Sequence, residues 1–349
     1  MQYRTKKVLS SKFRRAIRWE FWPMWVFYFP VVFYILYLSL RYRGLTFLSV
    51  NPGLPMSGLI GERKAATLMQ LNGSPFLAQF CVLLKANPLS TRIESARSFI
   101  KEKNLSYPIV MKPDFGQRGQ DVAVIRSEEK MHGYLNNAVS DVILQEHIEG
   151  EEFGIFYLRY LEKTHGEIFS ITEKTFPVLV GDGKKTLEEL IMDNPRTHYM
   201  AKYLLDLHAN KISTVLAENE PFKVVEIGSH CRGSVFLEGK ENISEQLTKE
   251  IDQLSSQIDG FYFGRYDIRV TNKDNLKEGK SFKVLEVNGV TSESTNMYDP
   301  AYSVVDAYKI LFKQWRAAFE IGKQNINKGA ELVSISKLLK HLYLSLIHI

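Results

Sequence analysis

The chain has 349 residues, of which 45% are hydrophobic and 24% charged, so it can build the core of one large or two modest domains. Its two cysteines, Cys81 and Cys231, lie far apart without a CxxC spacing, and its eight histidines are scattered without an HExxH pair. These features exclude a disulfide framework and a recognisable zinc motif, and they favour a reducing, cytoplasmic location.

The net charge of +6 is concentrated at the start of the chain. Residues 1–20 contain a single acid, Glu20, and seven cations: Arg4, Lys6, Lys7, Lys12, Arg14, Arg15 and Arg18. Basic arms bind nucleic acid or anionic lipid. The next twenty residues, FWPMWVFYFPVVFYILYLSL, are uncharged and strongly aromatic, which is not typical of a nucleic-acid module. We therefore expect anionic membrane lipid as a partner, and no nucleic acid.

As a helix, this apolar run would reach roughly 30 Å, the thickness of a hydrocarbon core. Pro23 and Pro30 interrupt it, however, and its Trp and Tyr side chains prefer the membrane interface. We expect a bent re-entrant or interfacial helix at the cytoplasmic face of a membrane, such as the bacterial inner membrane, with a true span as the alternative. A cleavable signal peptide is disfavoured because no small-x-small site follows the run.

The rest of the chain alternates between helix-like and strand-like segments, which predicts an α+β fold. The expected divisions are a basic arm with the membrane-associated helix (1–50), a helical lead-in (51–105), a first α+β subdomain (106–165), a second one (166–328) and a C-terminal helix or tail (329–349). The chain ends in LSLIHI, which resembles translated adapter sequence rather than native protein, and we assign it no function.

Three oxygen-bearing side chains interrupt two apolar strands late in the chain. FGRYDIRV contains Asp267, and FKVLEVNGV contains Glu286 and Asn288. Side chains alternate between the faces of a strand, so Glu286 and Asn288 point the same way. Converging buried oxygens need a counter-charge, and magnesium is a hard cation that suits them. The pattern predicts a site for one or two Mg²⁺ ions, with Mn²⁺ as a substitute.

An apolar strand ending in Lys112 leads into a glycine-containing loop, in YPIVMKPDFGQRGQDV. Gly116 and Gly119 let backbone amides approach an anion, and Lys112 and Arg118 supply positive charge. This combination is a candidate phosphate clamp, and a solvated hairpin is the alternative. The chain has neither a Walker loop nor a GxGxxG motif after a strand.

A third segment, ILQEHIEGEE, leaves the predicted core as a strand. The backbone groups that could meet an adenine edge belong to Gln145, Glu146, His147 and Ile148. Glu152, beyond a glycine, could accept ribose hydroxyls. A solvated acidic turn is the alternative.

The order of these motifs resembles the ATP-grasp superfamily over roughly residues 60–300, and the GRYD…EVN pairing is similar to that of D-alanine–D-alanine ligases. The resemblance implies two α+β subdomains clasping ATP, here preceded by the apolar helix. It also implies an ADP-forming ligase that joins a carboxylate to an amine through an acyl phosphate.

The resemblance assigns a role to each candidate. Lys112 would contact the phosphates, the loop with Gly116 and Gly119 would close over them, the strand at 145–148 would bind adenine and Glu152 the ribose. Asp267, Glu286 and Asn288 would hold magnesium, and Arg265 would stabilise negative charge as the acyl centre becomes tetrahedral. A second lysine lies upstream of the loop in this family, and Lys64 is the candidate, with Lys85 as the alternative.

FPVLVGDGKKTLEELI is similar to a segment of amide ligases related to cyanophycin synthetase. By that resemblance Lys174, His230 and Arg232 would line the substrate pocket, and surface cations are the alternative. The amino-terminal α/β domain usual in these ligases is replaced here by the basic arm and apolar helix, so the substrate cannot be copied from them. We expect a lipid or envelope-linked substrate. Soluble amino-acid or peptide substrates, or a non-catalytic nucleotide-binding membrane scaffold, are the alternatives.

Overall fold

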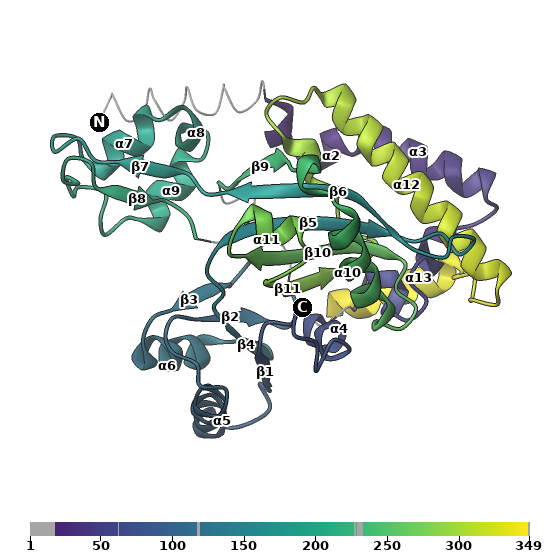
Figure 1. Cartoon of the computed structure of the whole chain (residues 1–349), viewed down its shortest axis with the longest axis horizontal. Helices are drawn as coiled ribbons and strands as arrows, with labels where there is room; N and C mark the ends of the chain where they lie inside the picture. Colours follow the sequence, from purple (N-terminus) through teal and green to yellow (C-terminus); the bar gives the residue numbers. More distant parts are fainter. Residues whose placement is uncertain (1–17, 62, 117–118, 227, 229–232, 348–349) are drawn as a thin grey trace.

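Two antiparallel β-sheets organise the protein, with helices packed around them (Figure 1). The computed structural model describes residues 18–61, 63–116, 119–226, 228 and 233–347. The predicted α+β content is confirmed. The predicted sites Arg118, His230 and Arg232 lie outside the described residues.

The larger sheet has five strands in the order β11-β10-β5-β6-β9. Its strands are β5 (Glu151–Leu158), β6 (Glu167–Thr175), β9 (Val235–Glu238), β10 (Phe263–Val270) and β11 (Phe282–Asn288). Between the last two strands lies the short helix α11 (Lys273–Lys277). The polar segment there lengthens the β10–β11 connection and leaves their pairing intact.

Strand β10 shows why the two faces of this sheet differ. Tyr266, Ile268 and Val270 join an apolar core with α10 (Glu245–Ser256), whose Leu247, Ile251 and Leu254 face the sheet. Their neighbours in the strand, at 265, 267 and 269, are charged and point to the opposite face. The alternation therefore builds a core on one face and a charged surface on the other.

The smaller sheet has the order β1-β4-β2-β3. Its strands are β1 (Phe80–Leu83), β2 (Ile109–Pro113), β3 (Ala123–Ile125) and β4 (Val142–Glu146). Helices α5 (Leu89–Glu102) and α6 (Glu128–Asn137) share an apolar core with it. Strand pairing thus places β1 and α5 with this sheet, although the sequence suggested a lead-in up to residue 105. Likewise β5 pairs with β10 and β6, across the expected boundary at 165.

A third unit projects from the larger sheet, at the upper left of Figure 1. It consists of the ribbon β7 (Val178–Val180) and β8 (Pro221–Lys223) with α7 (Leu187–Asp193), α8 (Pro195–His198) and α9 (Ala201–Leu207). These elements have an apolar core of their own. The unit includes β7 and α7 from the segment FPVLVGDGKKTLEELI, residues 176–191, and extends beyond it to β8.

The apolar N-terminal run folds as short pieces rather than one helix. They are η1 (Trp19–Phe21), α2 (Met24–Phe27) and α3 (Phe29–Arg41), followed by η2 (Thr46–Ser49), η3 (Pro55–Gly58) and α4 (Lys64–Met69). Pro30 lies in the first turn of α3, where a missing N–H costs little. None of the helices in the described part of the chain has both the length and the apolar character needed to cross a membrane.

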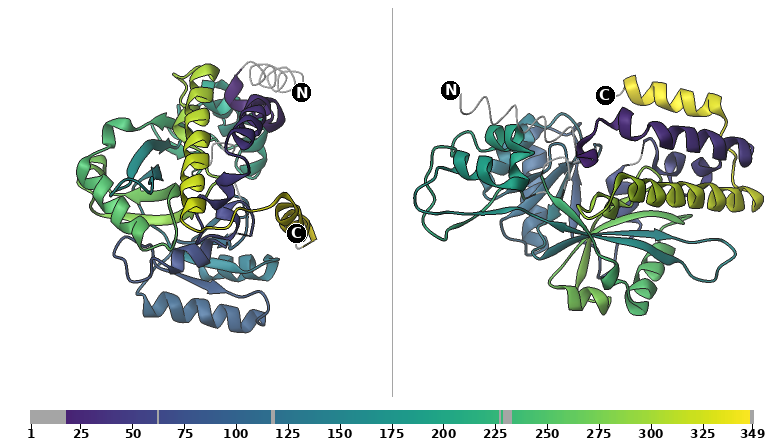
Figure 2. Two further views of the ribbon diagram at one scale, coloured as in Figure 1. Left: turned by 90° about the vertical axis from the view of Figure 1, so that its right-hand side faces the viewer. Right: turned by 90° about the horizontal axis from the view of Figure 1, so that it is seen from above.

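The long helix α12 (Val304–Asn327) holds this N-terminal segment against the larger sheet (Figure 2). Val31 packs with Leu311 in one cluster, and Leu38 packs with Phe319 in another. A Cβ at Gly322 would lie 1.9 Å from the carbonyl oxygen of Thr46, so glycine permits this close approach. The remaining described elements are η5 (Lys240–Asn242), η6 (Thr295–Tyr298) and α13 (Ile335–Ile347).

Candidate functional site

The three oxygen-bearing side chains predicted from the sequence meet on the charged face of the larger sheet. Asp267 is the cross-strand partner of Glu286, and Arg265 is the partner of Asn288. Directly opposed residues of antiparallel strands point to the same side. The Asn288 amide donates to Oδ2 of Asp267 at 3.2 Å. The register therefore places Asp267, Glu286, Asn288 and Arg265 together.

Asp267 is the most heavily engaged of these groups. Arg265 donates from Nε to Oδ1 at 3.0 Å and from Nη2 to Oδ2 at 3.1 Å, and Lys174 Nζ lies 2.9 Å from Oδ1. Burial alone would raise the pKa of this carboxyl, but the guanidinium of Arg265 and the ammonium of Lys174 hold the pKa well below its ordinary range. Asp267 is consequently ionised at all physiological pH values.

Lys174 joins Asp267 to a second buried carboxylate, that of Glu152. Its Nζ lies 3.1 Å from Oε1 of Glu152, and Oε2 accepts from Arg269 at 3.1 and 3.2 Å. Burial works against the charged form of Lys174, yet the two carboxylates raise its pKa. The sequence predicts that Glu152 binds ribose hydroxyls. In the structure this carboxylate is flanked by the cations of Lys174 and Arg269. The resemblance to amide ligases predicts that Lys174 lines the substrate pocket; in the structure its ammonium lies between Glu152 and Asp267.

Arg269 was missed by the sequence analysis, although a signal for it existed. It is two residues beyond Asp267 and four beyond Arg265, so strand alternation puts all three on one face. Gly154 on the neighbouring strand makes room for them. A Cβ at that position would lie 3.2 Å from Cδ of Arg265 and 3.5 Å from Oδ1 of Asp267.

Lys112 connects the smaller sheet to the larger one. Its Nζ donates at 2.9 Å to Oε1 of Gln145 on β4 and at 2.9 Å to the carbonyl oxygen of Leu285 on β11. The side chain is buried, and burial lowers its pKa, while the carboxylate of Glu286 opposes this effect. An anion bound beside Lys112 would favour the charged form of this lysine.

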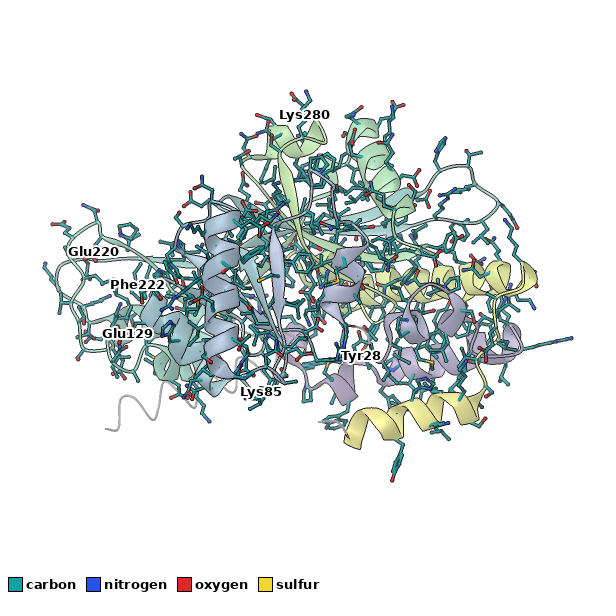
Figure 3. The ribbon with its side chains drawn as sticks, turned by 90° about the horizontal axis from the view of Figure 1, so that it is seen from below. Tyr28, Lys85, Glu129, Glu220, Phe222 and Lys280 are labelled. Atoms are coloured by element: carbon teal, nitrogen blue, oxygen red, sulfur yellow. The ribbon has the colours of Figure 1, made fainter. Side chains whose placement is uncertain are left out.

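Of the two candidates for the second lysine, only Lys64 lies near this cluster. Its Nζ donates to the carbonyl oxygen of Gly116 in the glycine loop and lies 3.6 Å from Oε1 of Glu286. Lys85 instead contacts the Ala138 carbonyl oxygen at 2.6 Å and lies in the smaller sheet's subdomain (Figure 3). Lys64 therefore lies beside the other candidate residues, and its role as the second lysine stays a prediction.

The glycine loop and the predicted adenine strand border the same region. Gly116 and Gly119 have φ values of +133° and +71°, which L side chains rarely adopt. On the strand, Glu146 accepts from the Gln79 amide at 3.1 Å, and the Ile148 carbonyl accepts from Arg269 at 2.8 Å. Burial lowers the pKa of His147, which favours a neutral imidazole there.

A loop after β11, residues 289–299, contacts the site residue Arg265. Arg265 Nη1 donates to the Glu293 carbonyl oxygen at 3.1 Å. The loop is anchored on β6 by hydrogen bonds between Thr295 and Thr172 (2.9 Å) and between Ser294 and Ser170 (2.5 Å). The Glu293 carboxylate accepts from the hydroxyl of Tyr28. The sequence analysis had not singled out this loop.

The donor set fits a hard divalent cation in its chemistry. Asp267, Glu286 and Asn288 offer two carboxylates and an amide oxygen on adjacent strands, which is the oxygen-only set that magnesium prefers. Within the described residues no three His, Cys, Asp or Glu side chains gather as a metal site. Any ion here would therefore need further oxygens, such as those of phosphates or water.

Residues 67–156 match the family model of the RimK-like ATP-grasp domain. The matched segment contains the whole smaller sheet with Lys112, and the first six residues of β5 with Glu152. The match supports an ATP-grasp domain in this segment, as the resemblance in the sequence predicted. No curated protein matches the chain in sequence.

Solved structures that are similar to the chain have low identity to it. A bifunctional glutathione synthetase from Pasteurella multocida is 15% identical, with 74% of this chain and 38% of that chain covered and a TM-score of 0.37. A D-alanine–D-alanine ligase from Bacillus anthracis is 13% identical, with coverages of 76% and 68% and a TM-score of 0.42. The VanG D-Ala:D-Ser ligase from Enterococcus faecalis is 14% identical, with 73% of this chain and 61% of that chain covered and a TM-score of 0.39. The chain thus spans about two fifths of the length of the first of these proteins.

Proposed function

We propose that this ATP-grasp protein is an ADP-forming carboxylate–amine ligase that works through an acyl phosphate. The observation that carries the proposal is the convergence of Lys64, Lys112, Lys174 and Arg265 with Asp267 and Glu286 between the two sheets. A triphosphate needs positive charge from several directions, and a carboxylate that attacks it must be shielded from its repulsion.

The chain's own cations would bind and orient the nucleotide. Lys112 and Lys64 reach the gap from the smaller sheet and from α4, and Lys64 ties the glycine loop to Glu286. Asp267, Glu286 and Asn288 would hold Mg²⁺, which when bound would offset the negative charge of the phosphates. Closure of the glycine loop would exclude water, which otherwise hydrolyses an acyl phosphate.

The reaction has two steps, formation of an acyl phosphate and attack on it by an amine. A substrate carboxylate oxygen forms a bond to the γ-phosphorus while the bond to the bridging oxygen of ADP breaks. An amine nitrogen then bonds to the acyl carbon, inorganic phosphate leaves, and the nitrogen loses a proton. Arg265, which contacts both Asp267 and the 289–299 loop, would stabilise the oxyanion of the second step.

The substrate is proposed to be a carboxylate or an amine carried by a lipid or an envelope component, handled at the cytoplasmic face of a membrane. The support is the position of the N-terminal segment, which contacts the 289–299 loop through Tyr28 and Glu293. The N-terminal segment is thus an aromatic, apolar neighbour of this loop.

The test is ADP release by the full chain with Mg²⁺ and ATP in membrane-lipid extract. Glu286→Gln should abolish it, because the substitution removes one of two carboxylates of the proposed metal set. Glu129→Gln, on the exposed side of α6, is the matched control and should leave it unchanged. Nucleotide binding without ADP release under any lipid or soluble-substrate condition would favour the scaffold alternative.

A further inference from the structure

The outer face of α2 and α3 is made of exposed apolar side chains. They are Met24, Trp25, Phe29, Val32, Phe33, Leu36, Tyr37 and Leu40. In α3 these positions follow the 3.6-residue period, so they form a continuous stripe along one side of the helix. Trp25 is 78% exposed and Leu40 82% exposed, which is unusual for such residues in a folded chain.

The opposite side of α2 and α3 packs into the apolar core of the protein. Phe27, Val31 and Leu38 are buried against α12 and its neighbours. The outer face is therefore an additional apolar surface that the core of this chain does not use. Figure 2 shows α3 along the margin of the molecule, on the side of α12 away from the five-stranded sheet.

The charges around this face favour an anionic occupant. Seven cations and one acid precede α2 in the sequence, and Arg41 and Arg43 follow α3. The acid, Glu20, is paired with Arg196 at 3.2 Å. A second copy of the chain placed on the same face would bring like charges together, including Arg41 and Arg43 of both chains, which costs energy through repulsion. An anionic bilayer offers both the apolar layer and the opposite charge.

We infer that the outer face of α2 and α3 docks in the plane of an anionic bilayer surface. At 13 residues, α3 is about 20 Å long, too short to span a hydrocarbon core of about 30 Å but sufficient to lie at the boundary of headgroups and acyl chains. Trp25 and Tyr37 are side chains that prefer this interface. Docking rather than spanning also keeps both ends of the segment on the side where ATP is found.

This docking places the proposed active site at the membrane. Tyr28, between α2 and α3, donates to Glu293 of the 289–299 loop, and Trp19 Nε1 donates to the Tyr302 carbonyl oxygen at 3.3 Å. A lipid-linked substrate could then reach the loop without leaving the bilayer. This consequence rests on the proposed function, whereas bilayer binding itself requires neither ATP nor turnover.

The experiment is flotation of the full chain, without nucleotide, with phosphatidylcholine vesicles that contain or lack phosphatidylglycerol. We expect binding that requires phosphatidylglycerol and weakens as salt is added. The double variant Phe33→Ser/Leu36→Ser should weaken binding by roughly tenfold or more, because two inserted apolar side chains are lost. The matched control, Val139→Ser/Leu207→Ser, removes two exposed apolar side chains elsewhere and should bind like the wild type.

Leu40→Ser provides a second variant should the double variant fail to fold, and it should weaken binding in the same direction. Circular dichroism and sedimentation of every variant report folding and self-association. The inference is overturned if folded outer-face variants bind vesicles as tightly as the wild type. It is equally overturned if the wild type ignores phosphatidylglycerol, or if it forms a dimer that the outer-face variants dissolve. Because no nucleotide is present, none of these results depends on the ligase proposal.

Discussion

Lys174 and Asp267 form a buried ion pair at the centre of the site, with 2.9 Å between Nζ and Oδ1. The same ammonium also contacts Glu152, so one lysine neutralises carboxylates that come from β5 and β10. Buried charges of this kind are costly unless each keeps its partner. The cluster therefore contributes to the stability of the fold, and its cations already balance the negative charge of Asp267 and Glu152.

Replacing Lys174 with Met should destabilise the protein by about 2–4 kcal/mol, because two buried carboxylates lose a cation while Arg265 and Arg269 still hold part of their charge. Urea unfolding measures this difference. Lys163→Met is the matched control, since Lys163 pairs with Glu167 at 2.8 Å on the exposed surface. That variant should lose no more than about 1 kcal/mol. Equal losses in the two variants would contradict the buried-cluster account.

The free energy of unfolding at acid pH should depend on Asp267. Its pKa is lowered below the ordinary value of 3.8, so its contribution is present above that value and is lost as the pH falls through the lowered pKa. The difference in unfolding free energy between the wild type and Asp267→Asn should therefore narrow as the pH falls from about 5 to about 2. Urea unfolding across this range tests it. A constant difference would mean that Asp267 is not the linked group.

Much of this site could be predicted from patterns among residues that are close together in the sequence. The period-two alternation of β11 puts Glu286 and Asn288 on one face, and the β10–β11 register adds Asp267. The strand, lysine and glycine loop around Lys112 lie within the segment that matches the RimK-like ATP-grasp family model. These inferences depend only on neighbours in sequence and on the known order of motifs.

The rest depended on pairings between distant segments. Nothing near Lys174 in the sequence shows that β6 lies beside β5, which is what turns its side chain towards Glu152. β1 is four residues long and gives little signal of its own, so its place beside β4 was missed. The contact between Tyr28 and Glu293 joins residues 265 positions apart.

Lys64 and Lys85 should differ in nucleotide binding. Lys64→Met removes a charge beside Gly116 and Glu286, and it should weaken Mg-ATP binding by roughly tenfold to a hundredfold, as expected for a charge-assisted contact. Lys85→Met, whose lysine contacts the Ala138 carbonyl, should change the affinity little. Isothermal titration calorimetry compares them. The reverse order would reassign the second lysine to Lys85.

Tyr28→Phe should separate membrane binding from its effect on the site. The substitution removes only the hydroxyl that bonds Glu293, so vesicle binding should be unchanged while lipid-stimulated ADP release falls by roughly tenfold. Tyr42→Phe is the matched control, because Tyr42 bonds Glu320 on α12 at 3.2 Å, away from the loop. Flotation and ADP assays on the same preparations measure both effects. Undiminished stimulation in Tyr28→Phe would show that the contact does not couple the two surfaces.

The most direct measurement of the central claim is trapping of the acyl phosphate. Hydroxylamine added to the full chain with Mg²⁺, ATP and membrane-lipid extract should yield a hydroxamate together with ADP, in an amount that depends on ATP and disappears in Glu286→Gln. ADP formed without any hydroxamate would contradict an acyl-phosphate ligase and would indicate phosphoryl transfer to another acceptor.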